Sequence, residues 1–287
     1  MSEPDSSLTV VRDVASLRRR VKVWRGEQRT VALVPTMGAL HAGHMALVKR
    51  AKALADAVVV SIFVNPTQFG PNEDLDAYPR RDAEDWALLN AAGVDLIFMP
   101  DASVMYPDGF QTGVQVPAVS QGLCGTHRPG HFEGVATVVT KLLLQGLPDL
   151  ALFGEKDFQQ LAVIKRLVID LDIPVDVLSV PTVRESDGLA LSSRNAYLSE
   201  DERAIAPKFY ATLSAAAAAI ANGADIKARC AQAEKAVLAA GFSSVDYIEV
   251  RIAESLLPLE VLGSEARILG AATLGQTRLI DNVKIPA

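Results

Sequence analysis

The chain has little cysteine, no strong excess of one charge and no long hydrophobic run. Its two cysteines, Cys124 and Cys230, are far apart and show no metal-ligand spacing, so we expect free thiols in a reducing compartment. Its 28 Lys and Arg residues against 34 Asp and Glu residues give a formal net charge of −6. An acidic chain is a poor general partner for nucleic acid or for an anionic membrane, so we expect neither.

Targeting and membrane segments are not expected either. Residues 1–7 are polar and acidic, and they lack the basic and apolar regions of a secretory signal. The longest unbroken apolar stretches, such as 215–221, fall far short of the ~20 residues that a membrane helix needs. The sequence therefore predicts a cytoplasmic protein.

Apolar runs alternate with helix-like segments over the first two thirds of the chain. Hydrophobic residues make up 49% of the sequence and charged residues 22%, as in ordinary globular proteins. Each apolar run is nearly continuous and is stopped by proline or glycine, which is typical of strands covered on both faces. We predict strands over 31–34, 58–64, 94–99, 149–153 and 175–180, with helices over 45–55, 82–92 and 159–171. This order predicts an α/β fold, a Rossmann-like open parallel sheet with helices on both faces.

The pattern changes after about residue 183. Two alanine-rich helices are predicted over 200–221 and 224–240, followed by strands over 245–250, 266–269 and 277–280. A length of 287 residues also exceeds what one core usually supports. We therefore expect an N-terminal domain over 1–183 and a smaller C-terminal α+β domain over 184–287.

Polar segments follow four of the predicted strands. In open parallel sheets, ligands bind beyond the carboxyl ends of the strands, so these segments are expected to meet at one edge. The plain alternative is that strand-to-helix loops are polar in any case. Histidine pairs, amides, a Lys-Asp pair and a Ser-Ser-Arg run together favour a site. The segments are 35–44, 65–70, 154–157 and 191–195.

The first segment contains the pattern His41-Ala42-Gly43-His44 at the entry of a predicted helix. Backbone N–H groups and the positive end of the helix dipole gather there, so phosphate is the natural ligand. Imidazole N–H donors can stabilise charge on an α-phosphate and its leaving pyrophosphate. Capping or surface histidines are the structural alternative.

The other segments supply cations and amides. Lys156 and Arg194 are the cations expected around a triphosphate, and Ser192 and Ser193 can donate to phosphate oxygens. The neutral amides of Gln68 and Gln160 suit a small substrate that bears hydroxyl and carboxylate groups. Each of these residues alone is more often structural or solvated.

Two metal hypotheses arise from the sequence. Asp85, beside Glu84, can hold Mg²⁺ through water, although a solvated helix face is the favoured interpretation of this pair. A zinc site built from the first two histidines with His127 and His131 is disfavoured, because no zinc motif spacing is present. Arg128 beside Gly130 instead indicates a second anion clamp.

Taken together, these motifs closely resemble the pantoate–β-alanine ligase family within the HxGH adenylyltransferase superfamily. The resemblance runs from about residue 9 to the C-terminus, and the combination of motifs is far more specific than HxGH alone. The residues that carry it are Pro35 to His44, Phe63 to Phe69, Tyr78-Pro79-Arg80, Arg128 to Phe132, Phe153 to Asp157 and Asp187 to Asn195.

The resemblance implies an enzyme of pantothenate and coenzyme A biosynthesis, usually a homodimer. In such ligases the (R)-pantoate carboxylate attacks the α-phosphate of Mg²⁺-bound ATP to give pantoyl adenylate and pyrophosphate. The amine of β-alanine then displaces AMP. The family fold implies a Rossmann-type domain that binds ATP and pantoate, and a C-terminal domain that acts as a lid.

Site residues carry over by motif. The resemblance gives His44 the role of catalytic histidine or proton donor, with His41, Lys156 and Arg194 as further catalytic groups. It assigns substrate binding to Gln68, Gln160, Asn65, Tyr78 and Arg128, and metal contact to Asp85. It assigns ATP binding to Met37, Gly38, Ala39, Leu40, His41, Ala42, Gly43, His44, Gly154, Glu155, Lys156, Asp157, Val183, Leu191, Ser192, Ser193 and Arg194.

Three residues depart from the family pattern without removing a charged group. Ala42 stands where an acidic residue is frequent, Phe158 where tyrosine is common, and Leu191 where methionine is common. Two other functions stay open at this stage. One is a different HxGH nucleotidyltransferase, and the other is a non-catalytic nucleotide-binding protein on the same fold.

Overall fold

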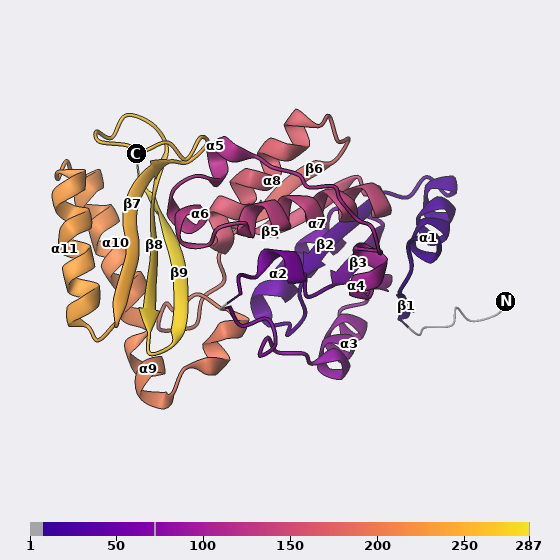
Figure 1. Cartoon of the computed structure of the whole chain (residues 1–287), viewed down its shortest axis with the longest axis horizontal. Helices are drawn as coiled ribbons and strands as arrows, with labels where there is room; N and C mark the ends of the chain where they lie inside the picture. The colour runs from indigo at the N-terminus through magenta and orange to yellow at the C-terminus, as the bar shows by residue number, and fades with distance from the viewer. Residues whose placement is uncertain (1–7, 72, 287) are drawn as a thin grey trace. The chain divides into compact units, whose positions relative to one another are not determined.

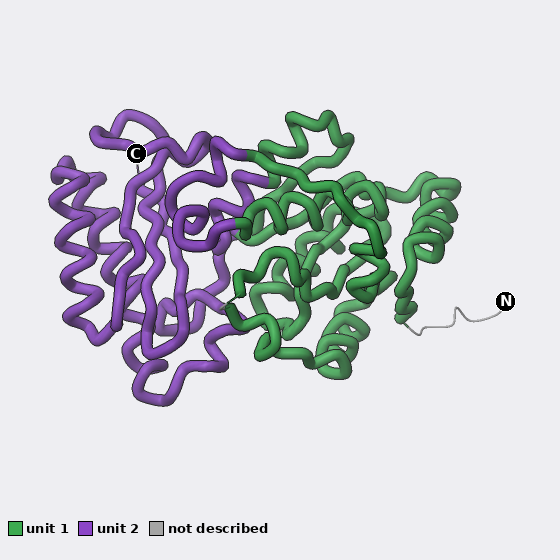
Figure 2. Tube along the Cα trace, viewed as in Figure 1, with its two compact units in different colours: residues 1–116, 130–154, 164–180 green, residues 117–129, 155–163, 181–287 purple. Residues whose placement is uncertain are grey.

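The computed structural model describes residues 8–71 and 73–286, which fold into two compact units (Figure 1). Unit 1 is drawn from the residues up to 116, from 130–154 and from 164–180, and unit 2 from 117–129, 155–163 and 181–287 (Figure 2). The expected boundary at 183 lies close to the last passage of the chain from unit 1 into unit 2. Two earlier segments also belong to unit 2, and a single boundary does not describe them.

Unit 1 is built on a six-stranded parallel sheet with the strand order β1-β4-β3-β2-β5-β6. The predicted parallel sheet is thus confirmed. Strand β1 was not predicted, because it is only three residues long and two of them are exposed. The strands are β1 Thr9–Val11, β2 Val31–Thr36, β3 Ala57–Ile62, β4 Leu96–Phe98, β5 Leu150–Gly154 and β6 Asp176–Val180.

Helices cover both faces of this sheet. Ala32 and Val34 of β2 pack in one cluster with Leu47 and Val48 of α2. Successive side chains of a strand point to opposite faces, so Leu33 faces the other side, where α1 and α7 contact β2. The helices of unit 1 are α1 Val14–Gly26, α2 Ala42–Lys52, the 3₁₀ helix η1 Pro66–Gln68, α3 Asp82–Ala91, α4 Ala102–Met105, α7 His131–Gly146 and part of α8 Phe158–Asp170.

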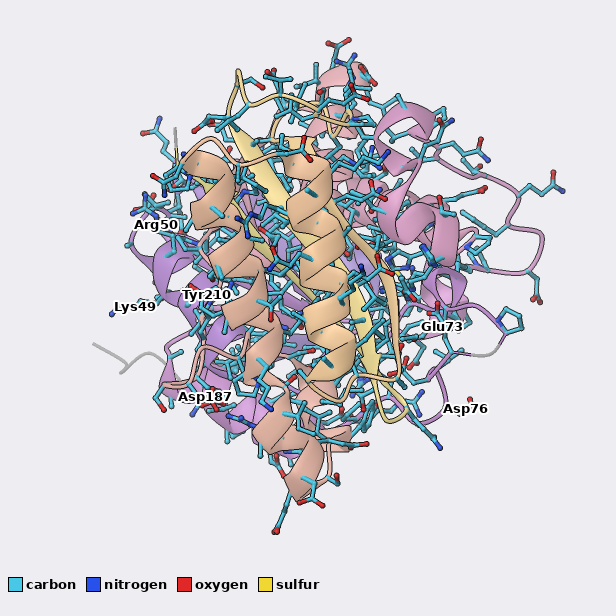
Figure 3. The ribbon with its side chains drawn as sticks, turned by 90° about the vertical axis from the view of Figure 1, so that its left-hand side faces the viewer. Lys49, Arg50, Glu73, Asp76, Asp187 and Tyr210 are labelled. Atoms are coloured by element: carbon cyan, nitrogen blue, oxygen red, sulfur yellow. The ribbon has the colours of Figure 1, made fainter. Side chains whose placement is uncertain are left out.

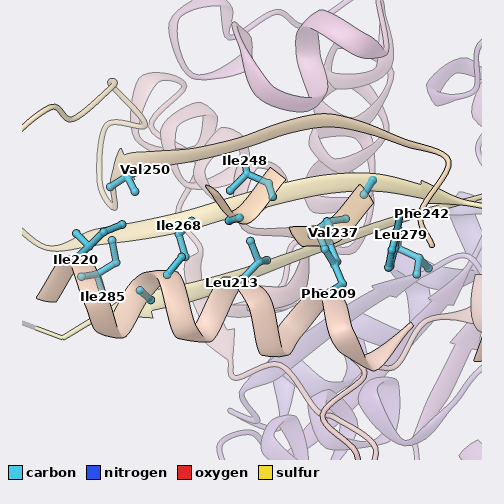
Figure 4. Packing of buried hydrophobic residues seen from close by; sticks show 14 of the residues in the cluster. Phe209, Leu213, Ile220, Val237, Phe242, Ile248, Val250, Ile268, Leu279 and Ile285 are labelled. Carbon is cyan, nitrogen blue, oxygen red and sulfur yellow. The ribbon is translucent and has the colours of Figure 1, made fainter. Parts of the chain in front are cut away.

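Unit 2 contains a three-stranded antiparallel sheet in the order β7-β8-β9, formed by Ser244–Ile252, Ala266–Leu274 and Thr277–Ile285. The predicted α+β character of this part is confirmed. Helices α10 Pro207–Ala221 and α11 Ile226–Ala239 pack on the sheet, and Phe209, Leu213 and Ile268 lie in their common core (Figure 4). Its shorter helices are α5 Pro117–Ser120, α6 Leu123–His127, η2 Glu155–Asp157, η3 Ser193–Tyr197 and α9 Glu200–Ile205.

Within the described residues, Glu200–Ala221, which runs through α9 and α10, is long and apolar enough to cross a membrane by length and composition. Such a segment was not expected from the sequence. Phe209, Leu213 and Ile220 from this stretch are almost fully buried in the core of unit 2. Core packing therefore accounts for the apolar character of the helix.

The register of the parallel strands places four strand ends at one edge of the sheet. Thr36 at the end of β2 pairs with Ile62 at the end of β3, and Gly154 at the end of β5 pairs with Val180 at the end of β6. Strands β2 and β5 are neighbours. Three of the four polar segments predicted from the sequence, 35–44, 65–70 and 154–157, therefore follow strands that end at this carboxyl edge, whereas 191–195 begins eleven residues after the end of β6 and belongs to unit 2.

Candidate functional site

The two histidines of the HxGH pattern form the N-terminal cap of α2. His41 is the N-cap residue, and its Nδ1 accepts a hydrogen bond from the Gly43 backbone N–H at 3.1 Å. The Nδ1 of His44 accepts from the His41 backbone N–H at 3.3 Å, which completes a capping box. The ring centroids are 4.1 Å apart. Because both Nδ1 atoms accept, the proton of each neutral ring lies on Nε2.

Capping and ligand binding are compatible here. The cap uses Nδ1 of each ring and gives each Nε2 the role of donor. Both donors stand at the positive end of the α2 dipole, where backbone N–H groups also favour an anion. The structural alternative considered from the sequence, capping histidines, thus describes how the rings are held in place.

The loop before α2 is fixed by the carboxylate of Asp85. Its two oxygens accept backbone N–H bonds from Ala39 at 2.8 Å and from Leu40 at 2.7 Å. The expected solvated position of this residue is wrong, since Asp85 of α3 is only 1% exposed. Burial raises the pKa of the Asp85 carboxyl above its usual range, although the two N–H bonds oppose that shift.

Backbone geometry explains why glycine precedes this loop. Gly38 has a φ of +82°, and a Cβ at this position would lie 3.0 Å from Oδ2 of Asp85. Ala39 also has a positive φ, of +49°. A positive φ is unfavourable for alanine, so the Asp85 hydrogen bonds hold this turn in a shape that the backbone alone disfavours.

The second segment forms a buried amide cluster after β3. Asn65 Nδ2 donates to Gln68 Oε1 at 3.1 Å and to the Gly134 carbonyl at 3.2 Å. Gln68 Nε2 lies 3.2 Å from the Met37 sulfur, which links this cluster to the loop before α2. The hydroxyl of Tyr106 donates to Asn65 Oδ1 at 2.7 Å. The structure therefore brings the predicted residues Asn65, Gln68 and Met37 together.

Helix α7 contacts the same cluster through its first turn. The Nδ1 of His131, at the first residue of α7, lies 2.9 Å from the Gln68 carbonyl oxygen. A Cβ on Gly134 would lie 2.4 Å from the Thr67 carbonyl oxygen, so only glycine allows this close approach of α7 to η1. Tyr78 is also buried in unit 1, with its ring edge-on to Phe69 at 5.8 Å.

In unit 2, Glu155–Asp157 form η2 directly after β5, which ends at Gly154. The Lys156 side chain is 19% exposed, and its Nζ lies 3.9 Å from the Asp157 carboxylate. The Glu155 carboxylate instead pairs with Arg267 of β8 at 2.5 Å. The Glu155 side chain thus holds the segment against β8.

The Ser-Ser-Arg segment begins η3 of the same unit. Ser192 caps η3, with its Oγ accepting from the Arg194 backbone N–H at 3.3 Å. The Leu191 backbone N–H donates to the Val183 carbonyl at 3.0 Å, which closes the loop between these two predicted ATP contacts. The amide of Asn195 donates to the Ala190 carbonyl at 3.0 Å. This segment is therefore ordered by its own hydrogen bonds.

Two other predicted residues lie on elements of unit 2. Gln160 is half-buried on α8 beside the fully buried Gln159, whose Oε1 accepts from the Cys124 backbone N–H at 3.0 Å. Arg128 is half-buried at the C-terminal cap of α6. In the part of the chain that the structure describes, no three His, Cys, Asp or Glu side chains form a group that could hold a metal ion.

Several supporting residues were missed by the sequence reasoning. They are Gly134 in unit 1, and Arg184, Arg267, Asp281 and Asn282 in unit 2. One signal was available: Asp281 and Asn282 are adjacent polar residues between the apolar pair Leu279-Ile280 and Val283. Adjacent polar residues in such a run indicate specific buried hydrogen bonds.

Comparison with known proteins gives consistent matches. The family model described as pantoate-beta-alanine ligase matches residues 9–284. The pantothenate synthetase of Paramagnetospirillum magneticum is 60% identical over 280 residues, which span 98% of this chain and 99% of the relative.

Solved structures agree with this match. The crystal structure of pantothenate synthetase from Thermus thermophilus superposes with a TM-score of 0.92 at 47% identity, and covers 98% of this chain and 100% of its own. The pantoate-beta-alanine ligase of Francisella tularensis, crystallised in complex with beta-gamma ATP and beta-alanine, has a TM-score of 0.81 at 35% identity. That match covers 97% of this chain and 98% of its own.

Proposed function

The chain belongs to the pantoate–β-alanine ligase family and joins pantoate to β-alanine with ATP as co-substrate, and we propose that it does so through a pantoyl adenylate formed beside His41 and His44. The observation that carries this proposal is the histidine capping box. It presents two imidazole Nε2 donors at the N-terminus of α2, where an α-phosphate is best stabilised.

The chemistry has two balanced steps. An oxygen of the pantoate carboxylate attacks the α-phosphorus of ATP, and the bond to the bridging oxygen of pyrophosphate breaks. The β-alanine amine then attacks the acyl carbon and loses a proton as the bond to AMP breaks. AMP leaves with the pantoate oxygen that formed the first bond. Neither step needs a covalent bond to the enzyme, so positioning and charge stabilisation supply the catalysis.

His44 is proposed as the proton donor and oxyanion stabiliser at the α-phosphate, with His41 beside it. Lys156 and Arg194 would neutralise the β- and γ-phosphates as pyrophosphate leaves. Residues 37–44 would bind ATP through their backbone, and the positive-φ turn at Gly38 supports this role. The remaining proposed ATP contacts are Gly154, Glu155, Asp157, Val183, Leu191, Ser192 and Ser193.

Pantoate is proposed to bind at the buried amides. Gln68 is 8% exposed and its amide is held in place by Asn65, and a fixed neutral amide suits a hydroxyl or carboxylate ligand. Gln160, Tyr78 and Arg128 complete the proposed substrate contacts. Lys156, Arg194, Gln160 and Arg128 belong to unit 2, so the proposal requires the C-terminal part to act as a lid over the labile adenylate.

Magnesium is proposed to arrive with ATP, whose phosphate oxygens it prefers as ligands. Asp85 does not fit a contact with this ion, because it is 1% exposed and both of its carboxylate oxygens accept backbone N–H bonds. Bound to ATP, the ion would neutralise phosphate charge. Asp85 itself serves mainly to hold the loop before α2.

Homodimerisation and a cytoplasmic location are also proposed. The two free cysteines support a reducing compartment, since neither is in a disulfide. Sedimentation velocity on the full chain tests the first proposal, and a single monomer peak at micromolar protein would contradict it. Fractionation of the producing cell, with the chain followed by antibody, tests the second.

The reaction is tested by measuring AMP and pyrophosphate with ATP, pantoate and β-alanine, omitting each substrate in turn. We expect pyrophosphate release to require ATP and pantoate, and pantothenate to require all three. Formation of ADP and phosphate instead would contradict the adenylate. Pyrophosphate release with phosphopantetheine in place of pantoate would favour another nucleotidyltransferase.

A further inference from the structure

Strand β9 carries two adjacent polar residues in the interior of unit 2. Asp281 is 5% exposed and Asn282 is 3% exposed, in the middle of the strand. Because successive side chains of a strand point to opposite faces, the two residues reach different neighbours. Buried polar groups are costly unless their hydrogen bonds are made, so what they bind is informative.

Asn282 holds the backbone of η2. Its Nδ2 donates to the Glu155 carbonyl at 2.8 Å and to the Lys156 carbonyl at 3.1 Å. Its Oδ1 accepts from Arg267 at 2.6 Å. The same guanidinium pairs with the Glu155 carboxylate and lies 4.2 Å from the ring centroid of Phe158. Asn282 thereby holds the backbone of Glu155 and Lys156, and Arg267 holds the Glu155 side chain.

Asp281 holds the loop that leads to η3. Its carboxylate accepts two hydrogen bonds from Arg184, at 2.6 and 2.9 Å. Arg184 also donates to the Gly188 carbonyl at 3.1 Å and lies 3.7 Å from the ring centroid of Tyr210, which Figure 3 labels on α10. The backbone of Arg184 pairs with Ala190 in an antiparallel bridge. Asp281 and Arg184 thus hold the loop in place up to Ala190, just before residues 191–194.

We propose that Asp281 and Asn282 are positioning residues that set the direction of the two proposed phosphate-binding segments of unit 2, 155–157 and 191–194. Strand β9 contacts both η2 and η3, and all of these residues belong to one compact unit. The strand therefore holds Lys156 and Arg194 in a fixed relation to each other. This inference rests on the proposed role of those two cations at the phosphates of ATP.

The Asn282→Asp variant separates positioning from packing. It keeps the side-chain volume and the oxygen that Arg267 contacts. It removes the two N–H donations to η2 and turns a charged oxygen toward the two carbonyl groups in their place. We expect kcat/KM for ATP in pyrophosphate release to fall about tenfold, the equivalent of one or two net hydrogen bonds, while KM for pantoate stays within about twofold. The matched control is Val283→Ala, a neighbour in β9 that packs against the core of unit 2.

A double-mutant cycle gives the deciding readout. If Asn282 acts through Lys156, then Asn282→Asp has almost no further effect on kcat/KM for ATP in a Lys156→Ala background. Equal factors in both backgrounds overturn the proposal. The proposal is also overturned if Asn282→Asp has the same thermal unfolding temperature as Val283→Ala and keeps the wild-type kcat/KM for ATP.

Two further arms keep the test decisive. If Asn282→Asp fails to fold, the fallback variant is Arg267→Lys, which weakens the contacts of Arg267 with Asn282 and Glu155. We expect it to lower kcat/KM for ATP in the wild-type background and to have almost no effect in the Lys156→Ala background. Additive effects of the two substitutions overturn the proposal. Wild-type enzyme that releases no pantoate-dependent pyrophosphate contradicts the proposed function itself, which distinguishes that failure from failure of this inference.

Discussion

The carboxylate of Asp85 accepts a hydrogen bond from the Leu40 backbone N–H at 2.7 Å, across 45 residues of sequence. Its other oxygen accepts from Ala39 at 2.8 Å. A residue on α3 therefore fixes the turn that leads into the histidine cap of α2. The position of the proposed phosphate donors depends on this turn, because His41 follows Leu40 directly.

Replacing Asp85 with asparagine is expected to loosen that turn. Asparagine presents one oxygen and one amide group, so at least one of the two backbone N–H groups loses its acceptor. Hydrogen bonds to charged groups are worth about 1.5–3 kcal/mol, so we expect KM for ATP to rise about tenfold or more, with a smaller change for pantoate. Steady-state kinetics measures this. Glu84→Gln, at an exposed position of the same helix, is the control, and equal effects of the two changes would contradict the assignment.

His44→Ala is expected to slow adenylation by about 10²- to 10³-fold, as for loss of one preorganised donor. The fold should persist, with a cost of about 1 kcal/mol for the lost cap. Single-turnover pyrophosphate release measures the rate, and thermal unfolding measures the fold. His127→Ala, at an exposed histidine of α6, is the control. A His44→Ala enzyme with near-normal turnover would show that this histidine is not catalytic.

Gln68→Ala is expected to weaken pantoate binding more than ATP binding. The amide lies in the Asn65 cluster and is held by two neighbours, so its loss removes a pre-oriented partner of the substrate. We expect KM for pantoate to rise about tenfold, from loss of roughly 1–2 kcal/mol. The control is Gln145→Ala, a buried glutamine of α7 outside the cluster. Parallel losses for both ligands would count against the pantoate assignment.

Gly134→Ala and Gly146→Ala form a matched pair on α7. A methyl group at 134 would lie 2.4 Å from the Thr67 carbonyl oxygen, whereas at 146 its nearest neighbours are 3.9 and 4.0 Å away. We expect the first change to destabilise the protein by about 1–3 kcal/mol, as overpacking does, and to raise KM for pantoate. The second should be neutral or slightly stabilising. Chemical denaturation compares them, and equal stabilities would refute the close approach.

Much of this fold follows from local pattern. The runs around Val34 and Val60 are apolar, as strands with helices on both faces must be. The predicted stops are wrong in detail, because β2 continues through Pro35 to Thr36 and β3 ends at Ile62. Strand β1 and helix α7 escaped prediction for opposite reasons. The first is a short and exposed edge, whereas the second was overlooked although Phe132, Val135 and Val139 recur at helical spacing along it.

Within the candidate site, the sequence predicted which residues gather in one short segment, as in residues 41–44 and 65–68. It did not predict the hydrogen bonds between residues that are distant in the sequence. Asp85 looked like one more acidic side chain on a solvated helix, because nothing local shows that its carboxylate meets Leu40. Asn282 and Lys156 are likewise joined only by the tertiary fold.

The adenylate route is tested most directly with pantoate labelled by ¹⁸O at both carboxylate oxygens, incubated with ATP, β-alanine and enzyme. Attack of the carboxylate on the α-phosphorus predicts one ¹⁸O in AMP and one in the amide carbonyl of pantothenate, read by mass spectrometry. Unlabelled AMP, or label found in inorganic phosphate, would contradict the account.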